Sequence, residues 1–255
     1  NTVFTFEYNN FEQLKKIVKK HKIGAIKMEV KRTSDPKDNF LNKIRNLATQ
    51  NNIVLIFDEC TSGFRQTYGG IHKFYNIEPD MAIFGKALGN GYAINAIIGK
   101  RNIMEQSQKS FISSTFWTER VGSAAALETL EIMDKTKSWK EITSTGKKIK
   151  KNWKRLSILH NLDLKIQGID AVPNFYFNSK NNLEYKTLIT QEMLKKNILA
   201  SNMIYCALPH KEKILKKYFD ILESIFYKIS KVEKDQKNVS DYLHSEVAKS
   251  GMRNK

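Results

Sequence analysis

Residues 53–91, IVLIFDECTSGFRQTYGGIHKFYNIEPDMAIFGKALGNG, contain two apolar runs that each lead to a reactive polar residue. Residues 53–57 form an uninterrupted, β-branched run that stops at Asp58, and residues 81–84 form a second run that Lys86 follows. Such runs favour strands that are covered on both faces, as in a parallel sheet. In open α/β sheets the ligand crevice lies beyond the carboxyl ends of the strands. We therefore expect Asp58 and Lys86 to face one ligand.

An acid and an amine directed at one crevice match the needs of pyridoxal phosphate. Its aldehyde forms a Schiff base with a lysine, and a carboxylate keeps its ring nitrogen protonated. A lysine in mid-chain is more often a solvated surface residue, and an aspartate at a strand end is more often a helix cap. Neither ordinary role explains the pairing of Asp58 with Lys86. Gly89 and Gly91 also suit a close backbone approach next to the lysine.

A longer pattern extends this match from residue 57 to residue 101. The pieces FDECTSGFR, YGG, PD, FGKALGNGYAI and IIGKR resemble the class III aminotransferase family in residue type and in spacing. Within that family they are most similar to the glutamate-1-semialdehyde aminomutase branch. The resemblance covers nearly all of residues 1–230 but only the later part of a family member. We therefore expect a fragment that lacks the first strands, the Gly/Ser phosphate loop and the aromatic residue that stacks on the cofactor.

The resemblance implies the pyridoxal-phosphate-dependent transferase fold type I, an α/β fold. We expect a partial large domain with a mostly parallel sheet at residues 1–135, and a smaller α+β domain with a polar tail at residues 136–255. Apolar stripes of helical period predict helices, and short β-branched or aromatic runs predict strands. The expected helices cover residues 11–18, 40–48, 120–133, 139–160, 187–196 and 214–229. The expected strands cover residues 23–30, 53–57, 81–84, 93–99, 164–166, 175–177 and 198–208, and a loose tail is expected from Lys231.

The resemblance also implies a role for each site residue. Lys86 would carry the Schiff base and then move the substrate's proton, and Asp58 would hold the ring nitrogen. Cys60 would pack on the ring as a small hydrophobic side chain. Thr61 stands where many members have a glutamine that bonds the phenolic oxygen of the cofactor, so it is a possible contact. Thr115 would reach across a dimer interface to the phosphate of the neighbouring subunit's cofactor; its ordinary alternative is a turn that caps the next helix.

Three further polar residues are left outside the catalytic set. Relatives carry Glu-Pro near Glu29, whereas Val30 follows it here, so a solvated or ion-paired strand end is the alternative to a role at the site. We expect Glu59 and Arg65 to form structural ion pairs.

The function that the resemblance implies is enzymatic transfer of an amino group between a small-molecule donor and acceptor, in a homodimer with shared sites. Intramolecular transfer by an aminomutase is the alternative, because both reactions use the same lysine and acid. A hypothesis of another class is a non-catalytic, basic interaction module or an inactive fragment. The intact Lys86 and Asp58 argue against that module, and the expected missing N-terminal region argues for it.

Composition bounds the remaining classes. The chain has 255 residues, is 41% hydrophobic and carries a formal charge of +17, so it is long enough for a sizeable core. Only seven of its 43 basic residues are arginine, the residue suited to bidentate phosphate and base recognition, so we expect a solvated lysine-rich surface rather than a nucleic-acid groove. Cys60 and Cys206 show no disulfide pattern, and the histidines show no metal-ligand spacing. With no apolar run long enough to span a bilayer, a cytoplasmic enzyme without a metal or membrane partner is expected.

Overall fold

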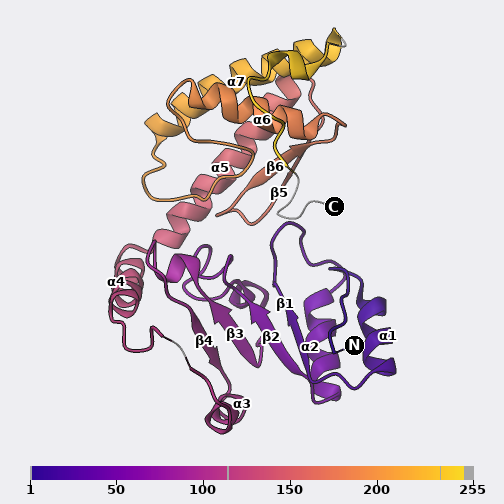
Figure 1. The fold of residues 1–255 in the computed structure, drawn as a ribbon, viewed down its shortest axis with the longest axis vertical. Helices are drawn as coiled ribbons and strands as arrows, with labels where there is room; N and C mark the ends of the chain where they lie inside the picture. The colour runs from indigo at the N-terminus through magenta and orange to yellow at the C-terminus, as the bar shows by residue number, and fades with distance from the viewer. Residues whose placement is uncertain (1, 114, 236, 250–255) are drawn as a thin grey trace. The chain divides into compact units, whose positions relative to one another are not determined.

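A computed structural model describes residues 2–113, 115–235 and 237–249 of the chain (Figure 1). Its contacts divide the chain into two compact units, Asn1–Lys140 and Glu141–Lys255. The division falls within the helix α5 (Ser138–Leu159). Each unit has its own sheet.

The first unit is built on a four-stranded sheet in the order β1-β2-β3-β4 (Figure 1). The strands β1 (Ala25–Met28), β2 (Val54–Asp58) and β3 (Met81–Phe84) are parallel, and β4 (Ala96–Gly99) runs antiparallel to β3. The mostly parallel sheet predicted from the sequence is confirmed. β4 is shorter than predicted.

The two faces of this sheet differ in burial because alternate residues of a strand point to opposite faces. One face is buried, and the helix α2 (Phe40–Gln50) contributes Phe40 and Ile44 to the buried core of the unit. The other face, which carries Lys27 and Asp58, is only partly buried. The buried face comprises Ile26, Met28, Leu55, Phe57, Ala82 and Phe84.

The first helix of this unit begins at a side-chain cap. α1 (Phe11–Lys20) follows Asn10, whose side chain accepts a hydrogen bond from the amide of Gln13 at 3.1 Å. The Gln13 side chain accepts in turn from the amide of Glu7 at 2.7 Å. The remaining helical segments of the unit are η1 (Ile71–Tyr75), η2 (Lys86–Leu88), α3 (Arg101–Met104), η3 (Glu105–Lys109) and α4 (Val121–Thr136).

The second unit packs three long helices against a two-stranded antiparallel sheet. The strands are β5 (Leu164–Gln167) and β6 (Asn174–Phe177); the helices are α5, α6 (Asn182–Leu194) and α7 (Glu212–Lys234). Trp153 of α5 is fully buried, and its indole nitrogen donates to the hydroxyl of Tyr218 in α7 at 3.0 Å. The predicted helices on α5 and α7 and the two strands are confirmed.

The strand predicted at residues 198–208 is wrong. The segment forms only an isolated bridge, between Met203 and Asn174. The amide of Ile204 donates to the carbonyl of Pro173 at 3.1 Å, but a proline has no N–H to return the bond, so the ladder is interrupted. The side-chain amide of Asn202 also donates to the carbonyl of Phe175.

The loose tail predicted from Lys231 is also wrong for the described residues. α7 continues to Lys234, and the short helix η4 (Val239–Tyr242) buries Val239. Residues of α6 then hold the tail. The amide of Ala248 donates to Thr187 at 2.9 Å, and Gln191 exchanges hydrogen bonds with the backbone at residues 242 and 244.

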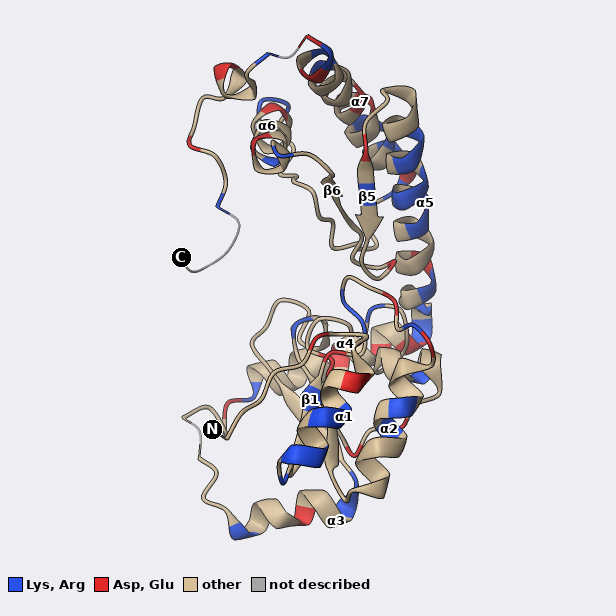
Figure 2. Cartoon of the chain, turned by 90° about the vertical axis from the view of Figure 1, so that its right-hand side faces the viewer, with Lys and Arg blue, Asp and Glu red and all other residues tan. Residues whose placement is uncertain are grey.

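Lysine and arginine positions, blue in Figure 2, are spread along the helices and are dense on α5. In α5, Lys147, Lys151 and Lys154 are exposed while Ile149 and Trp153 are buried. None of the helices in the described part of the chain combines the length and the apolar character that crossing a membrane requires.

Candidate active site

Four of the five predicted site residues meet at the carboxyl edge of the sheet. Asp58 ends β2 opposite Ile83 of β3, and Lys86 begins η2 just after β3. The amide of Cys60 donates to Asp58 Oδ1 at 3.2 Å, and Lys86 Nζ lies 3.0 Å from Thr61 Oγ1. The parallel pairing of β2 with β3 therefore brings the acid and the amine to one edge, as the sequence predicts.

The backbone just before Lys86 is closely packed. A Cβ at Gly85 would lie 2.3 Å from Asn95 Oδ1 and 3.3 Å from Cys60 Sγ, so a larger residue there would force the Asn95 side chain to move. Lys86 itself has φ +42°, in the left-handed region, which costs a residue other than glycine on the order of 1 kcal/mol. The surrounding contacts must hold this conformation. They fix the direction in which Lys86 leaves the strand end.

Asp58 is partly buried, which by itself disfavours its charged form. Burial alone would raise its pKa, but hydrogen bonds from Lys27 and from the Cys60 amide outweigh burial and lower the pKa of Asp58. Lys27 Nζ lies 2.9 Å from Asp58 Oδ2. The site therefore presents an ionised carboxylate, which is the form that binds a protonated ring nitrogen.

Cys60 presents a neutral thiol. Burial and the neighbouring charge of Asp58 raise the pKa of the Cys60 thiol, and the cations Lys86 and Lys27 only partly offset that rise. A neutral, partly buried thiol behaves as a small apolar group. This chemistry suits a packing contact and does not suit a nucleophile.

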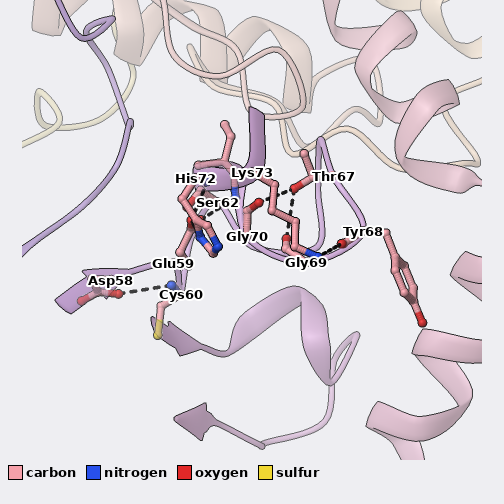
Figure 3. Close-up of polar contacts among 11 residues, drawn as sticks. Asp58, Glu59, Cys60, Ser62, Thr67, Tyr68, Gly69, Gly70, His72 and Lys73 are labelled. Atoms are coloured by element: carbon pink, nitrogen blue, oxygen red, sulfur yellow. Dashed lines mark hydrogen bonds and ion pairs between the residues drawn. The ribbon is translucent and has the colours of Figure 1, made fainter. Parts of the chain in front are cut away.

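Glu59 points away from Asp58 and is fully buried (Figure 3). Its carboxylate accepts hydrogen bonds from the Ser62 hydroxyl and from the amides of Ile71 and His72, both at 3.0 Å. His72 Nδ1 lies 2.9 Å from Glu59 Oε1. We call Glu59, Ser62, Ile71 and His72 the Glu59 cluster. It ties the end of β2 to η1 and so fixes the loop that carries Cys60 and Thr61.

Thr115, the fifth predicted site residue, belongs to a later segment of the chain. It is exposed, in a turn at residues 115–118 before α4, and its neighbour Ser114 lies outside the described residues. The ordinary alternative, that Thr115 caps α4, is wrong. The Glu119 carboxylate caps the helix instead, by accepting from the amides of Val121 at 2.9 Å and Gly122 at 3.4 Å.

Sequence reasoning missed Lys27, Ser62 and His72. Lys27 was detectable from the sequence. It is a charged residue between the apolar Ile26 and Met28 of a strand, and it lies on the same face of the sheet as Asp58. His72 carried no such signal, since only the folded loop brings it to Glu59. Of the residues left outside the catalytic set, Glu29 lies 3.3 Å from Arg32 in an ion pair, and Arg65 Nε donates to the Thr61 carbonyl at 2.7 Å.

Comparisons with known proteins show which family this chain belongs to. The family model for aminotransferase class-III matches residues 8–200. This chain belongs to the class-III aminotransferase family. The family predicted from the sequence is thereby confirmed, and Lys86, Asp58, Cys60 and Thr61 all lie within the matched range.

Two curated proteins are among those to which this chain is similar. It is 31% identical over 208 residues to 3-aminobutyryl-CoA aminotransferase of Cloacimonas acidaminovorans, covering 77% of this chain and 50% of the relative. It is 31% identical over 195 residues to glutamate-1-semialdehyde 2,1-aminomutase of Methanosphaera stadtmanae, covering 73% of this chain and 46% of the relative. The chain thus spans about half the length of these relatives.

Solved structures confirm the fold type. The FumI protein of Sphingopyxis sp. MTA144, in its PLP internal aldimine form, superposes with a TM-score of 0.83 at 21% identity, over 94% of this chain and 61% of that protein. Ornithine aminotransferase of Plasmodium yoelii gives 0.79 at 20% identity, over 90% of this chain and 63% of that protein. The predicted transferase fold type I is therefore correct. In the part of the chain that the structure describes, no three His, Cys, Asp or Glu side chains are grouped to hold a metal ion.

Proposed function

We propose that this chain carries the catalytic lysine and acid of a pyridoxal-phosphate-dependent enzyme that transfers an amino group. The observation that supports it most is the meeting of Asp58 and Lys86 at the carboxyl edge of β2 and β3. Membership of the class-III aminotransferase family supports the same function. An ionised acid, a directed amine and a neutral packing surface together fit the ring of this cofactor.

The residues of the chain divide the work. Lys86 would hold the cofactor through the amine Nζ and, when that amine is free, would carry a proton to or from the substrate carbon. Asp58 would hold the proton on the ring nitrogen. Cys60 packs against the ring face, and Thr61 Oγ1, 3.0 Å from Lys86 Nζ, is placed to orient that amine. When bound, the cofactor supplies an electron sink for the substrate carbon.

Transfer between two molecules and transfer within one molecule both remain compatible with these residues. The relatives named above include an aminotransferase and an aminomutase at the same 31% identity. We propose transfer from a small-molecule donor to a separate acceptor. Intramolecular transfer by a glutamate-1-semialdehyde aminomutase is the second candidate, favoured by the relative from Methanosphaera stadtmanae.

We further infer a homodimer in which Thr115 serves the cofactor phosphate of the neighbouring subunit. Thr115 is exposed, in the turn at residues 115–118, and exposed aromatic side chains stand near it in the sequence. Phe111 is 97% exposed and Phe116 is 74% exposed, which is unusual for a free surface and suits a subunit contact. A cytoplasmic location is proposed with it, supported by the free thiols Cys60 and Cys206.

The test is amino transfer by the full-length gene product supplied with pyridoxal phosphate. Asp58→Ala and the isosteric Asp58→Asn should each lower turnover about a hundredfold, because the charge that retains the ring proton is lost. Both variants should keep the wild-type circular dichroism spectrum. If the wild-type protein transfers no amino group to any oxo acid or aldehyde, or if both variants keep normal turnover, the proposed function is wrong.

A further inference from the structure

Lys27 is the nearest cation to the acid of the proposed site. It lies on β1, paired in register with Ile56, and its side chain reaches along β2 to the Asp58 carboxylate. The distance from Lys27 Nζ to Asp58 Oδ2 is 2.9 Å. The side chain of Lys27 is 57% exposed, so nothing in the packing of the sheet requires a charged residue there.

We propose that Lys27 is a positioning residue that shares the Asp58 carboxylate with the ring nitrogen of the cofactor and weakens the hold of Asp58 on it. The inference rests on the proposed function, because it concerns the same acid. It adds a residue that tunes the site from outside the group of Asp58, Cys60, Thr61 and Lys86.

The carboxylate has room for both cations. Asp58 Oδ1 accepts from the Cys60 amide at 3.2 Å and Oδ2 accepts from Lys27 at 2.9 Å. Each carboxylate oxygen has two lone pairs, so a protonated ring nitrogen can join as a third donor without displacing either. In the proposed arrangement Lys27 would keep its bond to Asp58 when the cofactor is bound, and the two positive charges would share one negative charge.

The presence of Lys27 should weaken the attraction between Asp58 and the ring nitrogen. Without Lys27, Asp58 would offer a full, uncompensated negative charge to the ring nitrogen. With Lys27 in place, the pair is close to neutral, and the like charge of the ammonium opposes the protonated ring. Two unit charges a few ångströms apart near a protein surface change an equilibrium constant by about tenfold or more. Because Lys27 is more than half exposed, solvent screens its charge, and we expect a change in the binding constant of about tenfold.

The chain offers a matched control in Lys100. Its Nζ lies 2.8 Å from Asp80 Oδ1, and its side chain is 54% exposed, against 57% for Lys27. Lys100 belongs to the same unit but pairs with a carboxylate at the other end of β3. Replacing it removes the same charge at the same exposure without touching Asp58.

The experiment measures the dissociation constant of pyridoxal phosphate for the full-length gene product and for Lys27→Met, Lys27→Arg and Lys100→Met. Lys27→Met should bind pyridoxal phosphate about tenfold more tightly than wild type. Lys27→Arg and Lys100→Met should bind it like wild type. An analogue in which a carbon replaces the ring nitrogen should show no gain in Lys27→Met, because the effect acts through that nitrogen.

The outcomes separate the two proposals. Equal or weaker binding of pyridoxal phosphate by Lys27→Met overturns the role of Lys27 and leaves the proposed function standing. An equal gain for the carbon analogue also overturns it, because the effect would then not involve the ring nitrogen. If none of the four proteins binds pyridoxal phosphate, the proposed function fails and the role of Lys27 fails with it.

Discussion

Asp80, at the residue scale, joins three segments of the first unit. Its Oδ2 accepts from the Leu55 amide at 2.8 Å and from Arg45 at 2.9 Å, and its Oδ1 accepts from Lys100 at 2.8 Å. In the sequence Asp80 only marks the start of a strand, since its partners come from α2, β2 and the end of β4. Asp58 and Lys86 were predictable because each stands at or just after the end of its own strand. Contacts such as those of Asp80, Lys27 and His72 depend on which segments the fold brings together.

Asp80 should give the protein a measurable acid sensitivity. Burial would raise its pKa, but the hydrogen bonds from Leu55, Lys100 and Arg45 outweigh burial and lower the pKa of Asp80 below its ordinary 3.8. Its stabilising contribution is therefore fully present above that ordinary value and is lost as the pH falls through the lowered folded-state pKa. Asp80→Asn should lower the free energy of unfolding at neutral pH by about 2 kcal/mol and flatten its acid dependence. Urea unfolding across acidic pH is the measurement; parallel losses in wild type and variant would contradict this role.

At the scale of elements, the period of the apolar residues predicted correctly the helices that bury one apolar side. α5 and α7 keep apolar residues at helical spacing because each packs one side against the core of the second unit. Periodicity failed at residues 198–208, where an apolar run reads as a strand. There the missing N–H of Pro173 and the side chain of Asn202 decide the outcome, and neither affects the apolar pattern. The prediction of a loose tail was wrong for a similar reason. Single polar groups of α6 hold the tail, and they leave no apolar pattern in the sequence.

The packing of α5 gives a second prediction. A Cβ at Gly146 would lie 1.6 Å from the carbonyl oxygen of Asp170, so the helix approaches that loop too closely for any side chain. Gly146→Ala should therefore destabilise the second unit by about 2 kcal/mol or more, although alanine favours a helix by about 1 kcal/mol. Ser144→Ala, on the exposed side of the same helix, is the control and should change the free energy of unfolding by less than about 0.5 kcal/mol. A neutral or stabilising Gly146→Ala, measured by denaturant unfolding, would show that α5 does not pack there.

On the scale of the whole molecule, this chain spans about half the length of the curated relatives it matches. The described part contains Asp58, Lys86 and the loop with Cys60 and Thr61, the residues proposed to bind the cofactor. Thr115, on the exposed turn before α4, is the proposed contribution to a neighbouring subunit. A family resemblance can predict that such a residue belongs to the site. Whether it contacts the cofactor of its own chain or of a neighbouring chain depends on the assembly.

Mixing two inactive variants tests that assembly. Lys86→Ala and Thr115→Ala would damage different halves of one shared site, so a mixed dimer would hold one site with both defects and one with neither. Activity should return on mixing, to about a quarter of wild type when chains exchange at random. Subunit exchange is verified with differently tagged chains. If Thr115 served its own chain, every site would keep one defect and mixing would restore nothing.

The most direct test of the account is to find the lysine that binds the cofactor. The full-length gene product, loaded with pyridoxal phosphate, is reduced with borohydride and its peptides are mapped by mass spectrometry. We predict that the label lies on Lys86, one of 36 lysines in this chain, and that Lys86→Ala takes up no label while Lys73→Ala is labelled like wild type. A label on another lysine, retained in Lys86→Ala, would contradict the central claim.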